Sequence, residues 1–236
     1  MAHPTPIVAL DVPDAASALA LLDRLGASAD FVKVGMQLFT AEGPAVVREL
    51  RGRKLRIFLD LKLHDIPNTV AHAVKSAAAL DVELLTVHAS GGASMLRAAA
   101  EAAAGTALTL LGVTVLTSLD ERELGEAWGR ERVEMEGEVE RLARLAAACG
   151  LPGVVASVHE IAVIRAAAPG LRVLAPGIRL AGDAAGDQSR VATPAEAARV
   201  GANYVVLGRS VTAAPDAAAA LSLALQEMRD ATRASE

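Results

Sequence analysis

Short apolar runs and longer amphipathic segments alternate along this chain of 236 residues. The apolar runs are rich in Val, Leu and Ile, which is typical of parallel strands that are covered on both faces. They predict eight strands, at 6–11, 30–35, 56–62, 83–88, 107–117, 153–157, 172–176 and 203–208. The amphipathic segments predict eight helices, at 15–25, 41–50, 68–80, 92–104, 137–149, 159–167, 194–200 and 216–229.

Eight strand–helix units in series, with no Pro-, Gly- or Ser-rich linker between them, predict an α/β fold. We interpret them as a single domain over 1–236, a closed TIM (β/α)8 barrel. An open doubly wound sheet is the alternative, although the even spacing favours closure.

Two connections are long. Residues 118–136 are highly charged and predict a solvated helical excursion, whereas the Gly- and Asp-rich residues 177–190 are typical of a binding loop.

Composition narrows the class of protein. The net charge of -5 argues against a nucleic-acid-binding protein, which would present a basic face. The Ala-rich stretches are interrupted by charges too often to span a membrane, and the first residues do not resemble a signal peptide. Cys149 is the only cysteine, so an intramolecular disulfide and a four-thiolate zinc site are excluded. A cytoplasmic enzyme is the class we expect.

Charged residues close the third apolar run. Because side chains alternate faces along a strand, Asp60 and Lys62 are expected to point the same way, away from the apolar Leu59 and Leu61. A second carboxylate, Asp65, follows. Charges are rarely buried unless they are paired. Such a group indicates either a functional site or a plug of paired charges at the rim of the barrel, and alone it does not distinguish them.

Polar residues also stand at the carboxyl ends of the other predicted strands. In a parallel barrel these ends form one face, where catalysis takes place. A purely structural barrel has no reason to collect ionisable groups there, so the pattern favours a functional site. The residues at these ends are Asp11, Lys33, Asp60, Lys62, His88, Thr117, Arg179 and Arg209.

The last two strands predict an anion site. Gly177 and Arg179 follow the seventh strand, and Gly208 and Arg209 follow the eighth. Loops after these strands often bind phosphate in such barrels, with backbone N–H groups that glycine leaves accessible. Either arginine can hold phosphate oxygens in a bidentate fork. A phosphorylated small molecule is therefore the expected substrate.

The chain resembles the orotidine 5'-phosphate decarboxylase family from residue 7 to about residue 211. The decamer DLKLHDIPNT at 60–69 is the most specific part of the resemblance, because its Asp-x-Lys-x-x-Asp core also occurs in sugar-phosphate decarboxylases and aldolases of the same barrel superfamily. Further matching motifs are LDV at 10–12, KVG at 33–35, VTVLTS at 113–118, PGIR at 176–179, GDQ at 186–188 and GR at 208–209.

The resemblance implies conversion of orotidine 5'-phosphate to uridine 5'-phosphate and carbon dioxide, the last step of de novo pyrimidine nucleotide synthesis, with no metal and no organic cofactor. It places Asp11 and Lys33 toward the ribose and Thr117 toward the pyrimidine. Gln188 would bridge base and phosphate, and Arg209 with Gly208 would hold the phosphate. A further set of residues, in this family, reaches the neighbouring subunit's site and implies a homodimer: Asp65, Ile66 and Thr69.

The charged residues are chemically suited to that reaction. Loss of carbon dioxide leaves an electron pair on a ring carbon, with no cofactor to delocalise it, so a fixed cation must stabilise it. Lys62 is the candidate: Asp60 and Asp65 favour its ammonium form, which can then protonate the carbanion. Lys33 would complete an alternating array of four charges. A metal-dependent sugar-phosphate enzyme, a catalytically inactive phosphate-binding barrel and a purely structural barrel are the alternatives.

Overall fold

The computed structural model describes residues 3–181 and 190–234. Within them, parallel strands form a closed barrel in which each strand pairs with the next and β1 pairs with β8. The strands are β1 (Thr5–Ala9), β2 (Phe31–Gly35), β3 (Arg56–Leu63), β4 (Leu84–His88), β5 (Thr109–Val113), β6 (Gly153–Val155), β7 (Arg172–Ile178) and β8 (Tyr204–Leu207). The predicted TIM barrel is confirmed, and the β1–β8 pairing excludes an open sheet.

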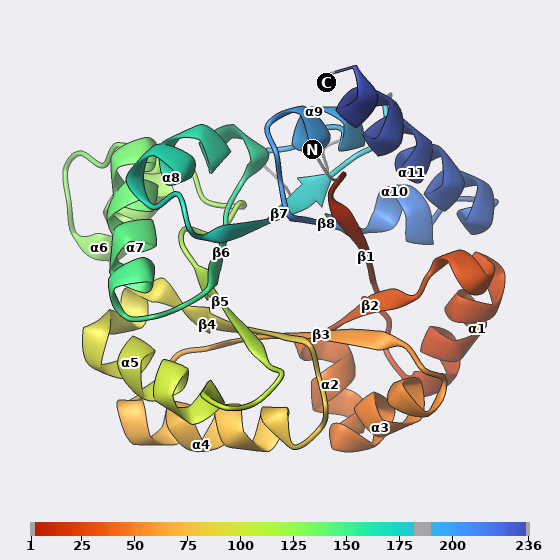
Figure 1. The fold of residues 1–236 in the computed structure, drawn as a ribbon, viewed down its shortest axis with the longest axis horizontal. Coiled ribbons are helices and arrows are strands. Elements are labelled where there is room, and N and C mark those ends of the chain that lie inside the picture. The colour runs from red at the N-terminus through yellow and green to blue at the C-terminus, as the bar shows by residue number, and fades with distance from the viewer. Residues whose placement is uncertain (1–2, 182–189, 235–236) are drawn as a thin grey trace.

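The helices surround the ring of strands (Figure 1). They are α1 (Ala15–Leu25), α2 (Met36–Glu42), α3 (Pro44–Gly52), α4 (Pro67–Ala78), α5 (Gly92–Ala103), α6 (Glu121–Trp128), α7 (Met135–Ala148), α8 (Ile161–Ala167), α9 (Pro194–Arg199), α10 (Arg209–Thr212) and α11 (Ala217–Arg233). Three short 3-10 turns are η1 (Gly26–Ser28), η2 (Ala89–Gly91) and η3 (Val158–Glu160). No helix in the described ranges is both long and apolar enough to cross a membrane.

Several predicted elements differ from the structure, and two of the differences are large. The helix expected at 41–50 is two helices, α2 and α3, because Gly43 adopts a left-handed φ of 61° and Pro44 then starts a new helix. The strand expected at 107–117 is shorter: β5 stops at Val113, opposite the last residue of the three-residue strand β6. The helical excursion predicted within 118–136 is confirmed as α6, which a capping box between Asp120 and Glu123 starts.

The core has two apolar layers, one inside the barrel and one between the strands and the helices. Alternate residues of each strand face the two layers, because successive side chains point to opposite faces. The inner layer fills the barrel below the strand ends and consists of Ile7, Ala9, Phe31, Phe58, Leu84, Leu111, Val113, Val155, Leu174, Tyr204 and Val206. Several members of this layer, among them Phe58, Val113, Val155 and Leu174, also line a cavity at the carboxyl ends of the strands.

Candidate active site

A cavity of about 640 Å³ lies at the carboxyl ends of the strands. Its volume lies within the usual range for a site that encloses a small molecule. Eight residues predicted from the sequence line it, and they come from six different strand ends: Asp11, Lys33, Asp60, Lys62, Thr117, Arg179, Gly208 and Arg209. The closed barrel thus brings together residues that are up to 198 positions apart, between Asp11 and Arg209.

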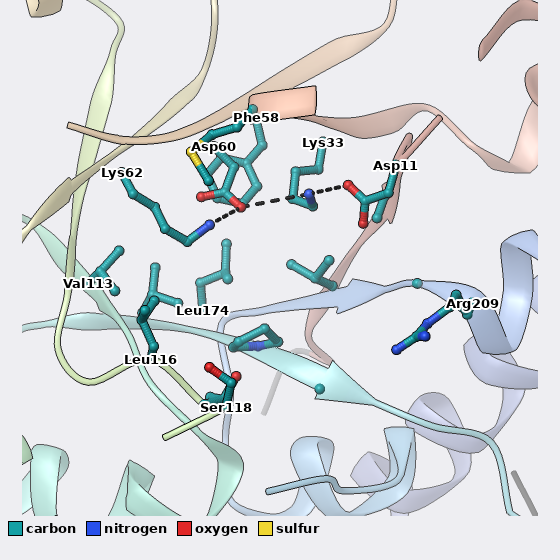
Figure 2. A pocket seen from close by; sticks show the side chains of 18 of the residues that line it. Asp11, Lys33, Phe58, Asp60, Lys62, Val113, Leu116, Ser118, Leu174 and Arg209 are labelled. Atoms are coloured by element: carbon teal, nitrogen blue, oxygen red, sulfur yellow. Dashed lines mark hydrogen bonds and ion pairs between the residues drawn. The ribbon is translucent and has the colours of Figure 1, made fainter. Parts of the chain in front are cut away.

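Four of these side chains form a row of alternating charge (Figure 2). Lys62 Nζ lies 2.8 Å from Asp60 Oδ2, and the same oxygen lies 3.7 Å from Lys33 Nζ. Lys33 Nζ in turn lies 2.7 Å from Asp11 Oδ1. The side chains of Lys33 and Asp60 are only 10% and 12% exposed. The side chains of Lys62 and Asp11 are 26% and 60% exposed, so water screens the Lys33–Asp60 interaction least and the Lys33–Asp11 interaction most.

Gly35 makes room for one of these ion pairs. A Cβ at this position would lie 2.9 Å from Lys33 Nζ and 3.2 Å from Asp11 Oδ1. Its φ of -91° suits any residue, so space and not backbone conformation requires the glycine here. The KVG motif at 33–35 therefore supplies both an ammonium group and the gap in which it lies.

The backbone of β3 is irregular where it presents Lys62. The pairing of β3 with β4 shifts between Leu59 and Leu63, and Lys62 has a left-handed φ of 49°. This conformation is unfavourable for a residue with a side chain, by roughly 1–2 kcal/mol. Asp60 and Lys62 share one face, as predicted. The reason is not the regular alternation of side chains along a strand, because the strand is irregular here. A bulge directs the lysine into the cavity.

Thr86 is a residue of this site that the sequence reasoning missed. Its hydroxyl accepts a hydrogen bond of 2.9 Å from the Lys62 backbone N–H and donates one of 2.9 Å to Asp60 Oδ1. The side chain is completely buried. A signal was present in the sequence: Thr86 lies between Leu84 and His88 on the inward face of the predicted fourth strand, where a lone hydroxyl needs a partner.

Apolar side chains form the wall between the charged groups. Figure 2 shows Leu174, Val113 and Leu116 around the space that Lys62 faces. Phe58 and Val155 also line the cavity. An apolar wall lowers the local dielectric constant, which strengthens the electrostatic field of the nearby ammonium groups. This arrangement is suited to stabilising a negative charge that develops on a bound molecule.

The predicted anion site occupies another part of the same cavity. Figure 2 shows Arg209 well apart from Lys62. Arg209 begins α10 after Gly208, and Arg179 follows β7, in which Gly177 has a left-handed φ of 75°. Hydrogen bonds from Arg179 N to Ala192 O and from Ala192 N to Gly177 O join the two ends of the intervening loop. Four cations face two carboxylates in the described lining, which favours an anionic ligand.

A buried ion pair supports the segment that carries Thr117. Arg190 forms an ion pair with Glu160, and it donates a hydrogen bond of 3.0 Å from Nη2 to the Leu116 carbonyl. Burial lowers the pKa of Arg190, although the group stays charged at neutral pH. These contacts connect the loops after β5, β6 and β7, so they fix one edge of the cavity.

Three predicted residues lie outside this cavity in the single chain. Asp65, Ile66 and Thr69 are exposed, where β3 leads into α4, and none of them lines the cavity. Asp65 Oδ1 accepts a hydrogen bond from the Ile66 N–H, and among the described ion pairs Asp65 forms none with Lys62. The four-charge array expected to include Asp65 is therefore completed by Asp11 within one chain. Gln188 lies outside the described residues.

Two histidines lie beside the charge row. The rings of His64 and His88 are 5.3 Å apart between centroids, and His64 is exposed. Burial lowers the pKa of His88, and electrostatic interactions with His64 and Lys62 lower it further, whereas Asp60 acts in the opposite direction. Burial therefore favours the neutral form of His88. Among the described residues, no three His, Cys, Asp or Glu side chains come together as a metal site would require.

Comparisons with known proteins point to one family. A family model described as "Orotidine 5'-phosphate decarboxylase / HUMPS family" matches residues 4–224. A Moorella thermoacetica protein named orotidine 5'-phosphate decarboxylase is 53% identical over 222 residues, which cover 91% of this chain and 88% of that protein. One of the same name from Anaeromyxobacter dehalogenans is 53% identical over 213 residues, covering 90% and 92%.

A solved structure agrees with these sequence matches. The crystal structure of orotidine 5'-phosphate decarboxylase from Lactobacillus acidophilus superposes with a TM-score of 0.84 at 35% identity, covering 96% of this chain and 99% of that one. The similarity therefore extends over nearly the whole chain.

Proposed function

Because the chain belongs to the orotidine 5'-phosphate decarboxylase / HUMPS family, we infer that it is a carboxy-lyase. It converts orotidine 5'-phosphate to uridine 5'-phosphate and carbon dioxide, the last step of pyrimidine nucleotide synthesis. One observation supports this function above the others: Lys62 Nζ, held 2.8 Å from Asp60, faces an apolar cavity that also contains two arginines.

We propose that Lys62 stabilises and then protonates the reacting carbon. The bond between the ring carbon and the carboxylate breaks, carbon dioxide leaves, and the electron pair stays on the ring carbon. The Lys62 ammonium attracts this pair and transfers one proton to it, which gives the product and a neutral amine. The amine regains its proton from solvent. Asp60 holds the ammonium in place at a fixed distance, so no reorganisation is needed when the charge develops.

The other lining residues have roles that fit their positions. Arg179, Gly208 and Arg209 would bind the phosphate, because the guanidinium groups offer bidentate donors and the start of α10 offers backbone N–H groups. Thr117 would contact the pyrimidine. Asp11 and Lys33, paired at 2.7 Å, would contact the ribose hydroxyls. Binding energy from the phosphate then serves to orient the reacting carbon against Lys62. The contact proposed for Gln188 stays a prediction.

We also propose a homodimer in which Asp65, Ile66 and Thr69 complete the partner's site. Ile66 is 67% exposed outside the cavity, and two other exposed apolar residues, Met36 and Leu116, line the cavity. Exposed apolar side chains around a mouth favour an interface. Mixing Lys62→Ala and Asp65→Ala chains tests this. Random exchange between two-fold dimers should restore about a quarter of the wild-type activity, and no restoration would contradict the shared site.

A metal-dependent sugar-phosphate decarboxylase or aldolase is the second candidate, because the Asp60–Lys62 core is common to both groups and the family description names HUMPS as well. The two functions differ in their need for a metal that stabilises an enediolate. The deciding experiment is a spectrophotometric assay with orotidine 5'-phosphate, with and without EDTA. We expect turnover that EDTA does not change. Absence of turnover would refute the proposed function and would be expected of a catalytically inactive binding barrel.

The cytoplasmic location stays a prediction. It is supported by the charge of the proposed substrate, since a nucleotide monophosphate does not cross a membrane unaided. The enzyme must therefore share a compartment with the enzyme that makes this nucleotide. Fractionation of cells into cytoplasmic and membrane fractions, with the decarboxylase assay applied to both, would test it.

A further inference from the structure

Thr86 connects Lys62 and Asp60, two adjacent members of the charge row, and it does not line the cavity. Its hydroxyl oxygen accepts from the Lys62 N–H and its proton goes to Asp60 Oδ1, both at 2.9 Å. A hydroxyl has one proton to donate, and here that proton has a carboxylate as its acceptor. The residue has no exposed surface, so it cannot touch a bound substrate.

The backbone of Lys62, which binds Thr86, has an unusual conformation that needs a contact from outside its own strand. Lys62 has a left-handed φ of 49° within a strand whose pairing with β4 is shifted, so the regular ladder does not hold it. A strained backbone persists only where its surroundings fix it. The Thr86 hydroxyl takes the place of a β4 backbone group as the acceptor for the Lys62 N–H. The hydroxyl is therefore part of what keeps the bulge in this conformation.

The same hydroxyl also orients the carboxylate. Asp60 Oδ1 is bound by Thr86, which leaves Oδ2 to face Lys62 Nζ at 2.8 Å and Lys33 Nζ at 3.7 Å. Without the hydroxyl, the carboxylate could rotate and divide its charge differently between the two ammonium groups. We infer that Thr86 is a positioning residue of the reaction, which fixes both the direction of Asp60 and the backbone from which Lys62 extends.

This inference rests on the proposed decarboxylase function and predicts a specific kinetic result. Thr86→Val keeps the shape of the side chain and removes both hydrogen bonds. We expect kcat to fall about ten- to a hundredfold, as for two lost hydrogen bonds of which one is to a charged group, while KM changes by less than about threefold. Thr86→Ser keeps the hydroxyl and should recover kcat to within about threefold of wild type.

Thr114→Val is the matched control. Thr114 is also a buried threonine of the barrel, 3% exposed, and its hydroxyl donates a hydrogen bond of 2.9 Å to the Val155 carbonyl. The same substitution there removes a buried hydrogen bond and should lower Tm similarly, but it leaves kcat within about threefold of wild type. Thr86→Val with unchanged kcat, or equal losses of kcat in the two variants, would overturn the inference.

A second measurement does not depend on turnover. Amide hydrogen exchange of the peptide covering 60–64 reports the bond from Lys62 N–H to Thr86. Exchange at Lys62 should be faster in Thr86→Val than in wild type and unchanged in Thr114→Val. If wild type does not act on orotidine 5'-phosphate but Thr86→Val still speeds this exchange, the proposed function fails while the positioning contact stands. Unchanged exchange in Thr86→Val would refute the contact itself.

Discussion

The two ends of the barrel both carry charged side chains on the inward face of the strands, but they use them differently: those at the carboxyl end line the cavity of about 640 Å³. At the amino end, Arg56 donates two hydrogen bonds to Glu83, at 2.8 and 2.7 Å, and its guanidinium lies 4.2 Å from the centre of the Phe31 ring. This bidentate contact with Glu83 raises the pKa of Arg56. Arg172 donates to Tyr204 and Thr109 across the same end. At this end of the barrel, the charged groups therefore bind neighbouring side chains.

At the carboxyl end, the charges surround a space instead of filling it. Lys62 and Lys33 share one oxygen of Asp60, and two arginines face the same cavity. The apolar inner layer of the barrel separates this group from the amino end. Strand-end charges by themselves therefore do not identify a site, as the amino end shows. The carboxyl end is distinguished by its cations, which outnumber the carboxylates around the cavity.

The largest expected effect at the carboxyl end comes from Lys62→Ala. Removing the ammonium removes both the stabilising charge and the proton donor, so kcat should fall by at least about a thousandfold. Steady-state assays with orotidine 5'-phosphate would measure this, and circular dichroism would show whether the barrel still folds. A folded variant within tenfold of wild type would contradict the assigned role.

Arg209→Ala sharpens the comparison within the cavity, since Arg209 lies well apart from Lys62 (Figure 2). We expect kcat/KM for orotidine 5'-phosphate to fall about a hundredfold, because a charge-assisted bidentate contact with phosphate is lost. Orotidine, which lacks the phosphate, provides the control: wild type and variant should process it equally. Equal losses on both substrates would place Arg209 elsewhere in the mechanism.

Gly35→Ala tests the space around Lys33 with a smaller change. The added Cβ would lie 2.9 Å from Lys33 Nζ, so the lysine must move and kcat/KM should fall about tenfold. Gly52→Ala is the matched control, because a Cβ at Gly52 meets no atom within 4 Å. Kinetic constants of Gly35→Ala equal to those of the control would show that the exact position of Lys33 does not matter.

Arg56→Met at the amino end should give the opposite result. The ion pair with Glu83 is partly exposed, so its loss should lower the free energy of unfolding by only about 1 kcal/mol. Activity should stay within about twofold of wild type, because the apolar layer separates Arg56 from the cavity. Chemical denaturation and the decarboxylase assay together measure this. A large loss of kcat with little change in stability would remove the distinction between the two ends.

Much of the architecture follows from local patterns in the sequence. The parallel barrel and α6 were predictable because strand periodicity and a capping box are local features. The cavity-lining set from Asp11 to Arg209 was predictable for a related reason: in a parallel barrel, every strand delivers its carboxyl end to one face. The break at Gly43 was not predicted, although a glycine followed by a proline marks it.

Other features depend on contacts between segments that are distant in the sequence. The bulge that gives Lys62 its left-handed φ depends on how β3 pairs with β4, and Thr86 acquires its role only through that pairing. The exclusion of Asp65 from the cavity depends on the direction in which the chain leaves β3. The sequence by itself determined which charged groups reach the mouth of the barrel, because side-chain chemistry and strand period are local. Only the tertiary structure decided which of them pair, because pairing depends on distances of a few ångströms across neighbouring strands.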